Sequence, residues 1–193
     1  THAEVEYFVN DASPALVVCD AKDDQSIGEI VRGTNAGVLT LNGTSLLANN
    51  TALSTGGGAV ILAALSVLEV TGARFIGNTA LGAGSGGGAI ALTQLSSASL
   101  SSVVASANAA DGFGGCVWID GAALTVTDSD FAHHVSRGGG GGTIAAQAPT
   151  RFVVDGSVIR HSTAVHGDGG CIWVVGSGTL LTNTDLVHCS TVD

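Results

Sequence analysis

Aromatic side chains, methionine and lysine are scarce in this 193-residue chain. Aromatic residues make up 4% of the sequence, methionine is absent, and Lys22 is the single lysine. A core with so few large aromatics must be filled by Val, Ile, Leu and Ala. Together with 29 glycines, these residues favour strands and tight turns over long helices. Hydrophobic residues are 45% of the sequence, which excludes a disordered chain of low hydrophobicity.

Positive charge is also scarce. Six Lys and Arg stand against 16 Asp and Glu, so the formal net charge is −10. A chain without a basic stripe cannot neutralise nucleic-acid phosphates or an anionic membrane surface. No apolar run reaches the roughly 20 residues of a membrane-spanning helix. We therefore expect no nucleic-acid partner and no membrane insertion by this segment. Because Thr1 is not preceded by Met or a signal-like segment, we expect a processed chain or a fragment of a longer one.

The cysteines fit no zinc-ligand spacing, and their number permits disulfides without fixing a pairing. The candidate disulfide cysteines are Cys19, Cys116, Cys171 and Cys189. Two N-x-[ST] sequons make Asn42 and Asn49 candidate glycosylation sites. Together with the acidity and the low lysine content, these features indicate an extracellular or cell-surface location.

A Gly-Gly pair followed by a small residue and an aliphatic residue recurs at intervals of 27–30 residues. Its five copies begin at Gly57, Gly87, Gly114, Gly141 and Gly169. A second, strand-like motif lies between them, in residues 70–78, 100–108, 126–134, 154–162 and 181–189. Stretches this short cannot bury a face within their own coil. Successive coils must therefore stack about 4.8 Å apart, with equivalent strands paired in parallel.

Helical repeats are excluded because runs such as residues 138–142, which are all glycine, would break their helices. The leucine-rich repeat has a comparable length, but its leucine and asparagine frame is missing. The sequence therefore predicts an all-β fold, a right-handed single-stranded parallel β-helix (β-solenoid) of about 5–6 coils of 27–30 residues.

Two neighbouring motifs carry a family resemblance. Residues 75–78 (Phe-Ile-Gly-Asn) and 87–90 (Gly-Gly-Ala-Ile) resemble the paired FxxN and GGAI motifs of chlamydial polymorphic outer-membrane protein repeats. That family is a surface-exposed, adhesin-like β-helix, so the resemblance implies this fold and role over roughly residues 39–190. Later coils depart from the pattern and place His134, Ser162 and Cys189 at the Asn position.

Stacking turns the alignment into columns that alternate between the inside and the outside of the coil. Two aliphatic columns should face the core: Val60, Ile90, Val117, Ile144, Ile172, and Leu62, Leu92, Ile119, Ala146, Val174. The two alternating columns should face outward: Ala59, Ala89, Cys116, Thr143, Cys171, and Ile61, Ala91, Trp118, Ala145, Trp173.

Both tryptophans therefore fall in one outward column, two coils apart. Trp118, Trp173 and Ile61 are the candidate contact residues, for a sugar ring, a neighbouring subunit or another segment of the same protein. The alternative is that the N-terminal segment or flanking chain covers this face. Two coils span about 9.6 Å, beyond disulfide reach, so Cys116 and Cys171 should not pair with each other.

Two further columns carry polar residues at a turn. The first should be a ladder of side-chain hydrogen bonds to the backbone: Asn49 or Asn50, Asn78, Asn108, His134, Ser162, Cys189. The second ends in His133, His161 and His188, which are weak candidates for a metal or pH-sensitive site. The outer two imidazoles are nearly 10 Å apart on this spacing, too far for all three to hold one ion, so no metal is expected.

A polysaccharide lyase, epimerase or hydrolase is the main alternative function. Such enzymes need clustered carboxylates, or carboxylates beside an Arg or Lys base. The acidic residues here are scattered, and the best constellation is Asp128 and Asp130 with Arg160 or Arg137 one coil away. A surface ion pair explains this pattern more simply. We therefore expect no catalysis and no cofactor.

The sequence thus predicts an N-terminal cap or linker, residues 1–26, followed by a β-helix, residues 27–193, whose final coil is incomplete. Continuation of the chain, proteolysis or a neighbouring subunit would each account for that coil. The expected function is a non-catalytic extracellular β-solenoid, a structural or adhesive component of a cell-surface structure or a filament subunit. Self-association, neighbouring chain segments and glycans are the expected partners.

Overall fold

The computed structural model describes residues 38–43, 45–53, 56–63, 65–82 and 84–192. The described residues from position 40 onward belong to one compact unit. The predicted N-terminal segment, residues 1–26, lies outside the described residues. Every regular element in the described part of the chain is a β-strand. Across those same residues, no helix is long and apolar enough to cross a membrane.

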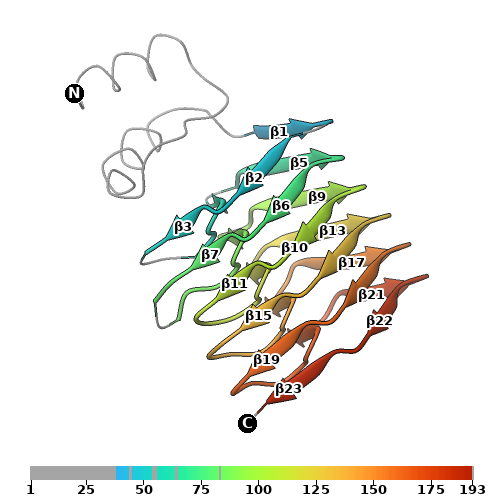
Figure 1. Cartoon of the computed structure of the whole chain (residues 1–193). Coiled ribbons are helices and arrows are strands. Elements are labelled where there is room, and N and C mark those ends of the chain that lie inside the picture. The colour runs from blue at the N-terminus through green and yellow to red at the C-terminus, as the bar shows by residue number, and fades with distance from the viewer. Residues whose placement is uncertain (1–37, 44, 54–55, 64, 83, 193) are drawn as a thin grey trace, which may run out of the picture. The chain divides into compact units, whose positions relative to one another are not determined.

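The described strands form four sheets, each built from equivalent strands of successive coils (Figure 1). Sheet A contains β1 (Val38–Asn42), β5 (Val67–Thr71), β9 (Ser97–Ser101), β13 (Ala123–Thr127), β17 (Arg151–Asp155) and β21 (Thr179–Thr182). Sheet B contains β2 (Leu46–Ala48), β6 (Arg74–Ile76), β10 (Val104–Ser106), β14 (Asp130–Ala132), β18 (Val158–Arg160) and β22 (Asp185–Val187). In both sheets, neighbouring strands follow one another in the order of successive coils along the chain. This is the topology of a solenoid.

The other two sheets follow the same rule. Sheet C contains β3 (Thr51–Ala52), β7 (Thr79–Ala80), β11 (Ala109–Ala110), β15 (Val135–Ser136), β19 (Thr163–Val165) and β23 (Ser190–Val192). Sheet D contains β4 (Val60–Leu62), β8 (Ile90–Thr93), β12 (Val117–Asp120), β16 (Ile144–Gln147) and β20 (Ile172–Val175). The chain is therefore a parallel β-helix, and the predicted fold is confirmed.

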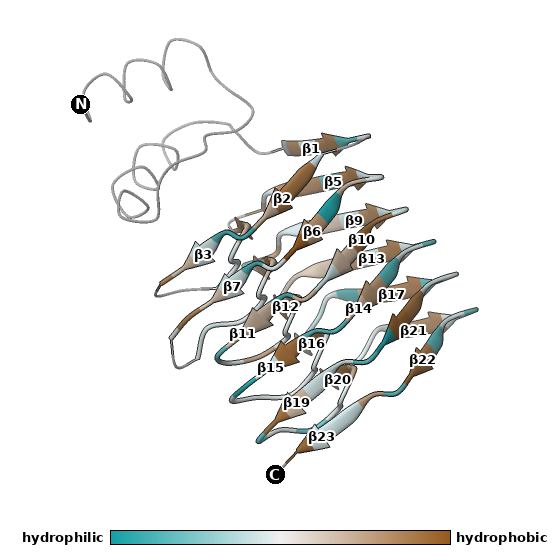
Figure 2. Ribbon diagram, in the orientation of Figure 1, coloured by the Kyte–Doolittle hydropathy of each residue, from teal (hydrophilic) through white to brown (hydrophobic). Residues whose placement is uncertain are grey.

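The predicted register is confirmed residue by residue. Val117 lies opposite Ile90 on one side and Ile144 on the other, and all the pairs are parallel. The neighbouring pairs extend this column to Val60 and Ile172. In the first four coils of sheet D these side chains are at most 8% exposed. The second predicted inward column is buried over the same coils. Outside the core, polar residues occupy many of the remaining strand positions and turns (Figure 2).

One predicted outward column is wrong. Ala89, Cys116, Thr143 and Cys171, which belong to the column that begins at Ala59, are at most 2% exposed and point into the interior. The cause is the sharp corner that precedes each strand of sheet D, which breaks the two-residue alternation of a strand. At Gly87, for example, φ is +70°, a left-handed conformation that favours glycine. The next glycine, Gly88, packs so closely that a Cβ atom would lie 2.2 Å from the Gly115 carbonyl oxygen.

The predicted polar ladder runs inside the turn between sheets B and C. Asn78 donates from its backbone N and from Nδ2 to Oδ1 of Asn108, at 2.8 and 2.9 Å. Asn50 makes the same two bonds to Asn78, so Asn50, and not Asn49, is the first member. The backbone N of Asn108 donates to Nδ1 of His134, and that of His134 donates to Oγ of Ser162. Buried backbone donors along the turn are thereby satisfied.

Candidate contact surface and histidine ladder

The two tryptophans share one column of sheet D, as the alignment predicts. Trp118 lies opposite Ala145, and Ala145 lies opposite Trp173. Both indoles are partly exposed. Ala91 and Ala145, in the same column, are 1% and 0% exposed, whereas Ile61 is 51% exposed. Within this predicted outward column, Ala91 and Ala145 are covered by the chain itself, whereas Ile61 is exposed and the two indoles are partly exposed.

The cover consists of Phe113 and the glycine-rich corners that precede sheet D. The Phe113 ring stacks on both indoles, with centroid distances of 5.1 Å to Trp118 and 5.5 Å to Trp173. We call these three residues the aromatic stack. Phe113 thus fills the space between two tryptophans that lie two coils apart. Stacked pairs of this kind contribute about 0.5–1.5 kcal/mol beyond the area that they bury.

Large and small residues alternate across this contact. The backbone of Gly86 lies against the Trp118 ring, and that of Gly140 lies against the Trp173 ring. A Cβ atom at either glycine would come within 2.5 Å of the indole Cγ. The residue before the Gly-Gly pair is thus glycine in both coils whose next coil carries tryptophan, and it is Phe113 where the next coil carries Ala145; Gly56, whose next coil carries Ala91, does not follow this exchange. This exchange of large and small residues is the signal in the sequence that points to Phe113, which lies outside the predicted strand columns.

The three predicted histidines stand on successive coils and form a histidine ladder: His133, His161 and His188. Their side chains are exposed. The rings of His133 and His161 are nearly parallel, with centroids 5.1 Å apart, and those of His161 and His188 meet edge to face at 4.8 Å. Within the described residues, no group of three His, Cys, Asp or Glu side chains is arranged to hold one metal ion.

Of the two carboxylates in the enzymatic alternative, Asp130 forms an ion pair with an arginine, whereas no ion pair is found for Asp128 among the described residues. Asp130 Oδ2 lies 2.8 Å from Arg160, as one of the predicted pairings requires. Arg137 instead pairs with Asp111, at 3.0 Å. The hydrogen bond donated by the Gly82 backbone, together with Arg137, holds the pKa of Asp111 below its usual value. The side chains of Thr182 and Asn183 donate to Asp155 and lower its pKa. Carboxylates held ionised in this way are poor general acids at neutral pH.

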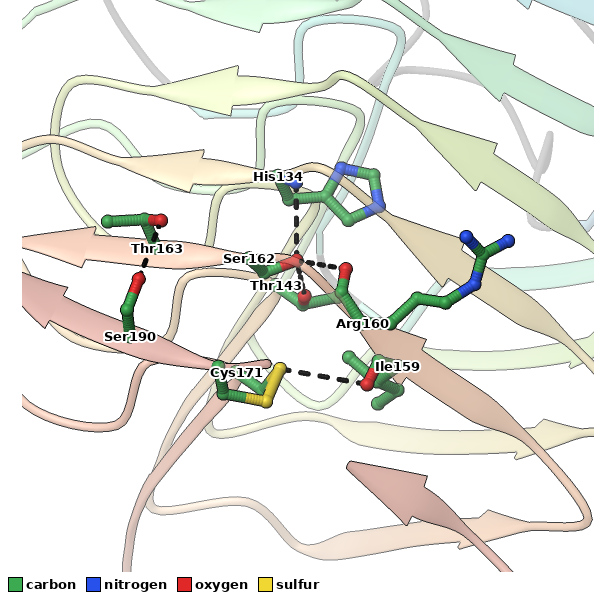
Figure 3. Close-up of a disulfide and its surroundings, with 9 residues drawn as sticks. His134, Thr143, Ile159, Arg160, Ser162, Thr163, Cys171 and Ser190 are labelled. Atoms are coloured by element: carbon green, nitrogen blue, oxygen red, sulfur yellow. Dashed lines mark hydrogen bonds between the residues drawn. A yellow bond between two sulfur atoms is a disulfide. The ribbon is translucent and has the colours of Figure 1, made fainter. Parts of the chain in front are cut away.

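Two of the candidate cysteines form a disulfide. Cys171 is bonded to Cys189, with the Cα atoms 5.1 Å apart, at the corner shown in Figure 3. Cys116 is a free, buried thiol, so its inclusion among the disulfide cysteines is wrong, and burial raises its pKa. The prediction that Cys116 and Cys171 do not pair with each other is confirmed. Cys19 lies outside the described residues.

Both candidate glycosylation sites lie near the first coil. The side chains of Asn42 and Asn49 are exposed, and Asn49 has a left-handed backbone conformation. Thr44, the hydroxyl residue of the first sequon, lies outside the described residues. An acceptor asparagine must be exposed, and both side chains meet this requirement. Glycosylation at Asn42 and Asn49 stays a prediction.

Comparison of the chain with protein-family models, with curated proteins and with solved structures finds no match. The resemblance to chlamydial polymorphic outer-membrane protein repeats therefore depends on the two short motifs at residues 75–78 and 87–90. It supports a proposal about function and does not assign a family.

Proposed function

We propose that this chain is a non-catalytic part of an extracellular β-solenoid, serving as a structural or adhesive component of a cell-surface structure. The observation that carries the proposal is the Cys171–Cys189 disulfide in an acidic protein. Disulfides form and persist in oxidising compartments and are rare in the cytosol. The two short motifs shared with an adhesin-like repeat family point in the same direction.

A structural role is supported by the way side chains are used inside the coils. Aliphatic columns, the polar ladder and the disulfide all tie each coil to its neighbours or close it on itself. Repeats that contact only their neighbours gain stability with each added unit. Such a segment is well suited to project or space other parts of a surface structure.

An adhesive role would use the partly exposed aromatic stack together with Ile61. Aromatic rings and exposed aliphatic side chains are enriched in contact surfaces. The occupant would be a glycan, a second copy of the chain or a neighbouring segment. Self-association through this face, or end to end as a filament subunit, would appear as concentration-dependent sedimentation and as fibres in negative-stain images.

Protease treatment of intact native cells tests the location. A surface protein is digested under these conditions, whereas a cytoplasmic marker survives. In parallel, the native chain is alkylated without reduction and digested with trypsin. Because no lysine or arginine lies between Arg160 and Cys189, Cys171 and Cys189 fall in one tryptic peptide. We expect this peptide to resist alkylation until it is reduced. Protection of the protein in intact cells together with free thiols in this peptide would overturn the proposal.

The alternative, a polysaccharide-active β-helix enzyme, is favoured by one observation. Asp130 and Arg160 place a carboxylate beside a guanidinium on the outer face of sheet B, at 2.8 Å. A carboxylate beside a guanidinium supplies one part of the group of carboxylates and an Arg or Lys base that a lyase-type site needs. Release of reducing ends from a panel of acidic and neutral polysaccharides, lost in an Asp130→Asn variant, would support the enzyme and contradict the non-catalytic proposal.

A further inference from the structure

The histidine ladder occupies a turn that holds its backbone rigidly. The φ angles of His133, His161 and His188 are 60°, 52° and 53°. The backbone N of His133 donates to the Arg160 carbonyl at 3.1 Å, and that of His161 donates to the Val187 carbonyl at 2.9 Å. Parallel pairing thus fixes the spacing of the three Cα atoms, while the exposed imidazoles keep rotational freedom.

We propose that adjacent imidazoles of the histidine ladder bind one divalent transition-metal ion of the Cu²⁺ type, with His161 as the shared ligand. Imidazole nitrogen suits copper, nickel and zinc, and copper binds most tightly in this series. Two nitrogens at about 2.0–2.1 Å from one ion lie roughly 3 Å apart. Small side-chain rotations would bring two rings with centroids 4.8–5.1 Å apart to this separation. Water would complete the coordination.

The stoichiometry follows from the position of His161. The outer histidines are two coils apart, about 9.6 Å, so they cannot share an ion. His161 can pair with either neighbour but not with both ions at once. One ion per ladder is therefore expected. This site goes beyond the proposed structural or adhesive role and does not depend on it.

The charges around the ladder have both signs, since Arg160 directly precedes His161 and pairs with Asp130 at 2.8 Å. Asp130 and Asp185 lie on the strands that lead into the His133 and His188 turns. The net charge of −10 also raises the local concentration of cations around the protein.

Titration of the full chain with CuCl₂ at pH 7, followed by calorimetry and by electron paramagnetic resonance, tests the site. We expect saturable binding of one ion, with hyperfine coupling to imidazole nitrogen. His161→Ala should weaken binding by about tenfold or more, since even groups that only support a ligand change affinity by that factor. His133→Ala and His188→Ala should each retain one pair, and the double variant should behave like His161→Ala.

Matched controls exist in the same chain. Ala107 occupies the same column with a φ of 54°, so alanine fits this turn, and circular dichroism checks the fold of each variant. His166 is exposed and also has a left-handed backbone conformation. His166→Ala should leave copper binding unchanged. His2→Ala tests for copper held near the amino terminus. Equal copper binding by the wild type and His161→Ala, or loss of binding in either control variant instead, would overturn the proposal.

Discussion

At the scale of single residues, His134 is the exception in the polar ladder. Its Nδ1 accepts a hydrogen bond from Asn108, so Nε2 carries the proton, yet Nε2 is buried without a hydrogen-bond partner. An unsatisfied buried donor costs about 1–3 kcal/mol. Burial also lowers the pKa of His134 to about 3, against an ordinary value of 6.5. Asparagine occupies the same column at Asn78 and Asn108, where all these bonds are made.

We therefore expect His134→Asn to raise the free energy of unfolding by about 1–3 kcal/mol at pH 7. The unfolded histidine takes up a proton below pH 6.5 while the folded one does so only near pH 3, so wild-type stability falls as the pH drops through this window. The loss between pH 7 and pH 5 should be about 2 kcal/mol larger than in the variant.

Urea unfolding at the two pH values measures both effects. Expression in a bacterial host avoids glycosylation of the sequon that the change creates at residues 134–136. His166→Asn, an exposed control, should unfold like the wild type. An equal pH dependence in wild type and His134→Asn would show that His134 is not held neutral by burial.

The ladder could be predicted from the sequence because Asn recurs at one point of a constant repeat. The inward direction of Cys116 and Thr143 could not, because a left-handed corner glycine shifts the alternation by one residue. Phe113 was missed for a related reason: it belongs to the corner, where column periodicity does not apply. The stacking of Phe113 between the two indoles depends on glycines at the equivalent corner position in neighbouring coils. Reading one strand column alone does not reveal this dependence.

At the scale of the elements, one side-chain contact recurs in two successive coils with different chemistry. It joins the residue that precedes a strand of sheet D to the turn between sheets B and C. The Thr143 hydroxyl donates to the Ser162 hydroxyl at 2.7 Å, and one coil further the equivalent residues are the disulfide-bonded Cys171 and Cys189 (Figure 3). A disulfide that closes a loop of about 15–20 residues stabilises by roughly 3 kcal/mol in the chain-entropy model. The same geometry should accept a second bridge.

A Thr143→Cys/Ser162→Cys variant should therefore form a disulfide spontaneously and gain about 2–3 kcal/mol over its own reduced state. Cys116→Ala in the background prevents mispairing, and Ala89 in the same column shows that alanine fits there. Peptide mapping without reduction identifies the bridge. Two thiols that stay accessible to alkylation under oxidising conditions would contradict the equivalence of the two corners.

The aromatic stack is also an element-scale feature, since it links the coil of Phe113 and Trp118 to the coil of Trp173 on the outer face of sheet D. Phe113→Ala should destabilise the fold by about 2 kcal/mol, less than the 3–5 kcal/mol of a fully buried ring, because Phe113 is partly exposed. Trp118 and Trp173 are the two tryptophans of the chain, so they account for its tryptophan fluorescence. Because loss of the Phe113 ring exposes both indoles to more water, this emission should shift to longer wavelength in Phe113→Ala. Ile61→Ser, at a 51% exposed position, should change neither the free energy of unfolding nor the wavelength of tryptophan emission. Unchanged fluorescence in Phe113→Ala would show that the indoles do not depend on this ring.

At the scale of the whole molecule, the repeat length dictates the architecture. Intervals of 27–30 residues keep each strand above its equivalent, so register could be predicted without knowing any contact. Coil-closing features, such as the disulfide, could not, because cysteine spacing alone leaves several pairings open. Function is the property that is hardest to predict from the sequence, because it depends on which outward side chains stay exposed to solvent.

The central claim is that equivalent positions lie directly over one another. Glu69, Ser99, Thr125, Val153 and Leu180 form one registered column on sheet A. The most direct test is electron–electron distance measurement between spin labels at Glu69→Cys and Val153→Cys, and at Glu69→Cys and Leu180→Cys, with Cys19→Ser and Cys116→Ala in the background. Stacked coils predict narrow distributions centred near 14 and 19 Å, a difference of about 4.8 Å for one coil. Broad distributions, or a difference that does not match a single coil, would contradict the account.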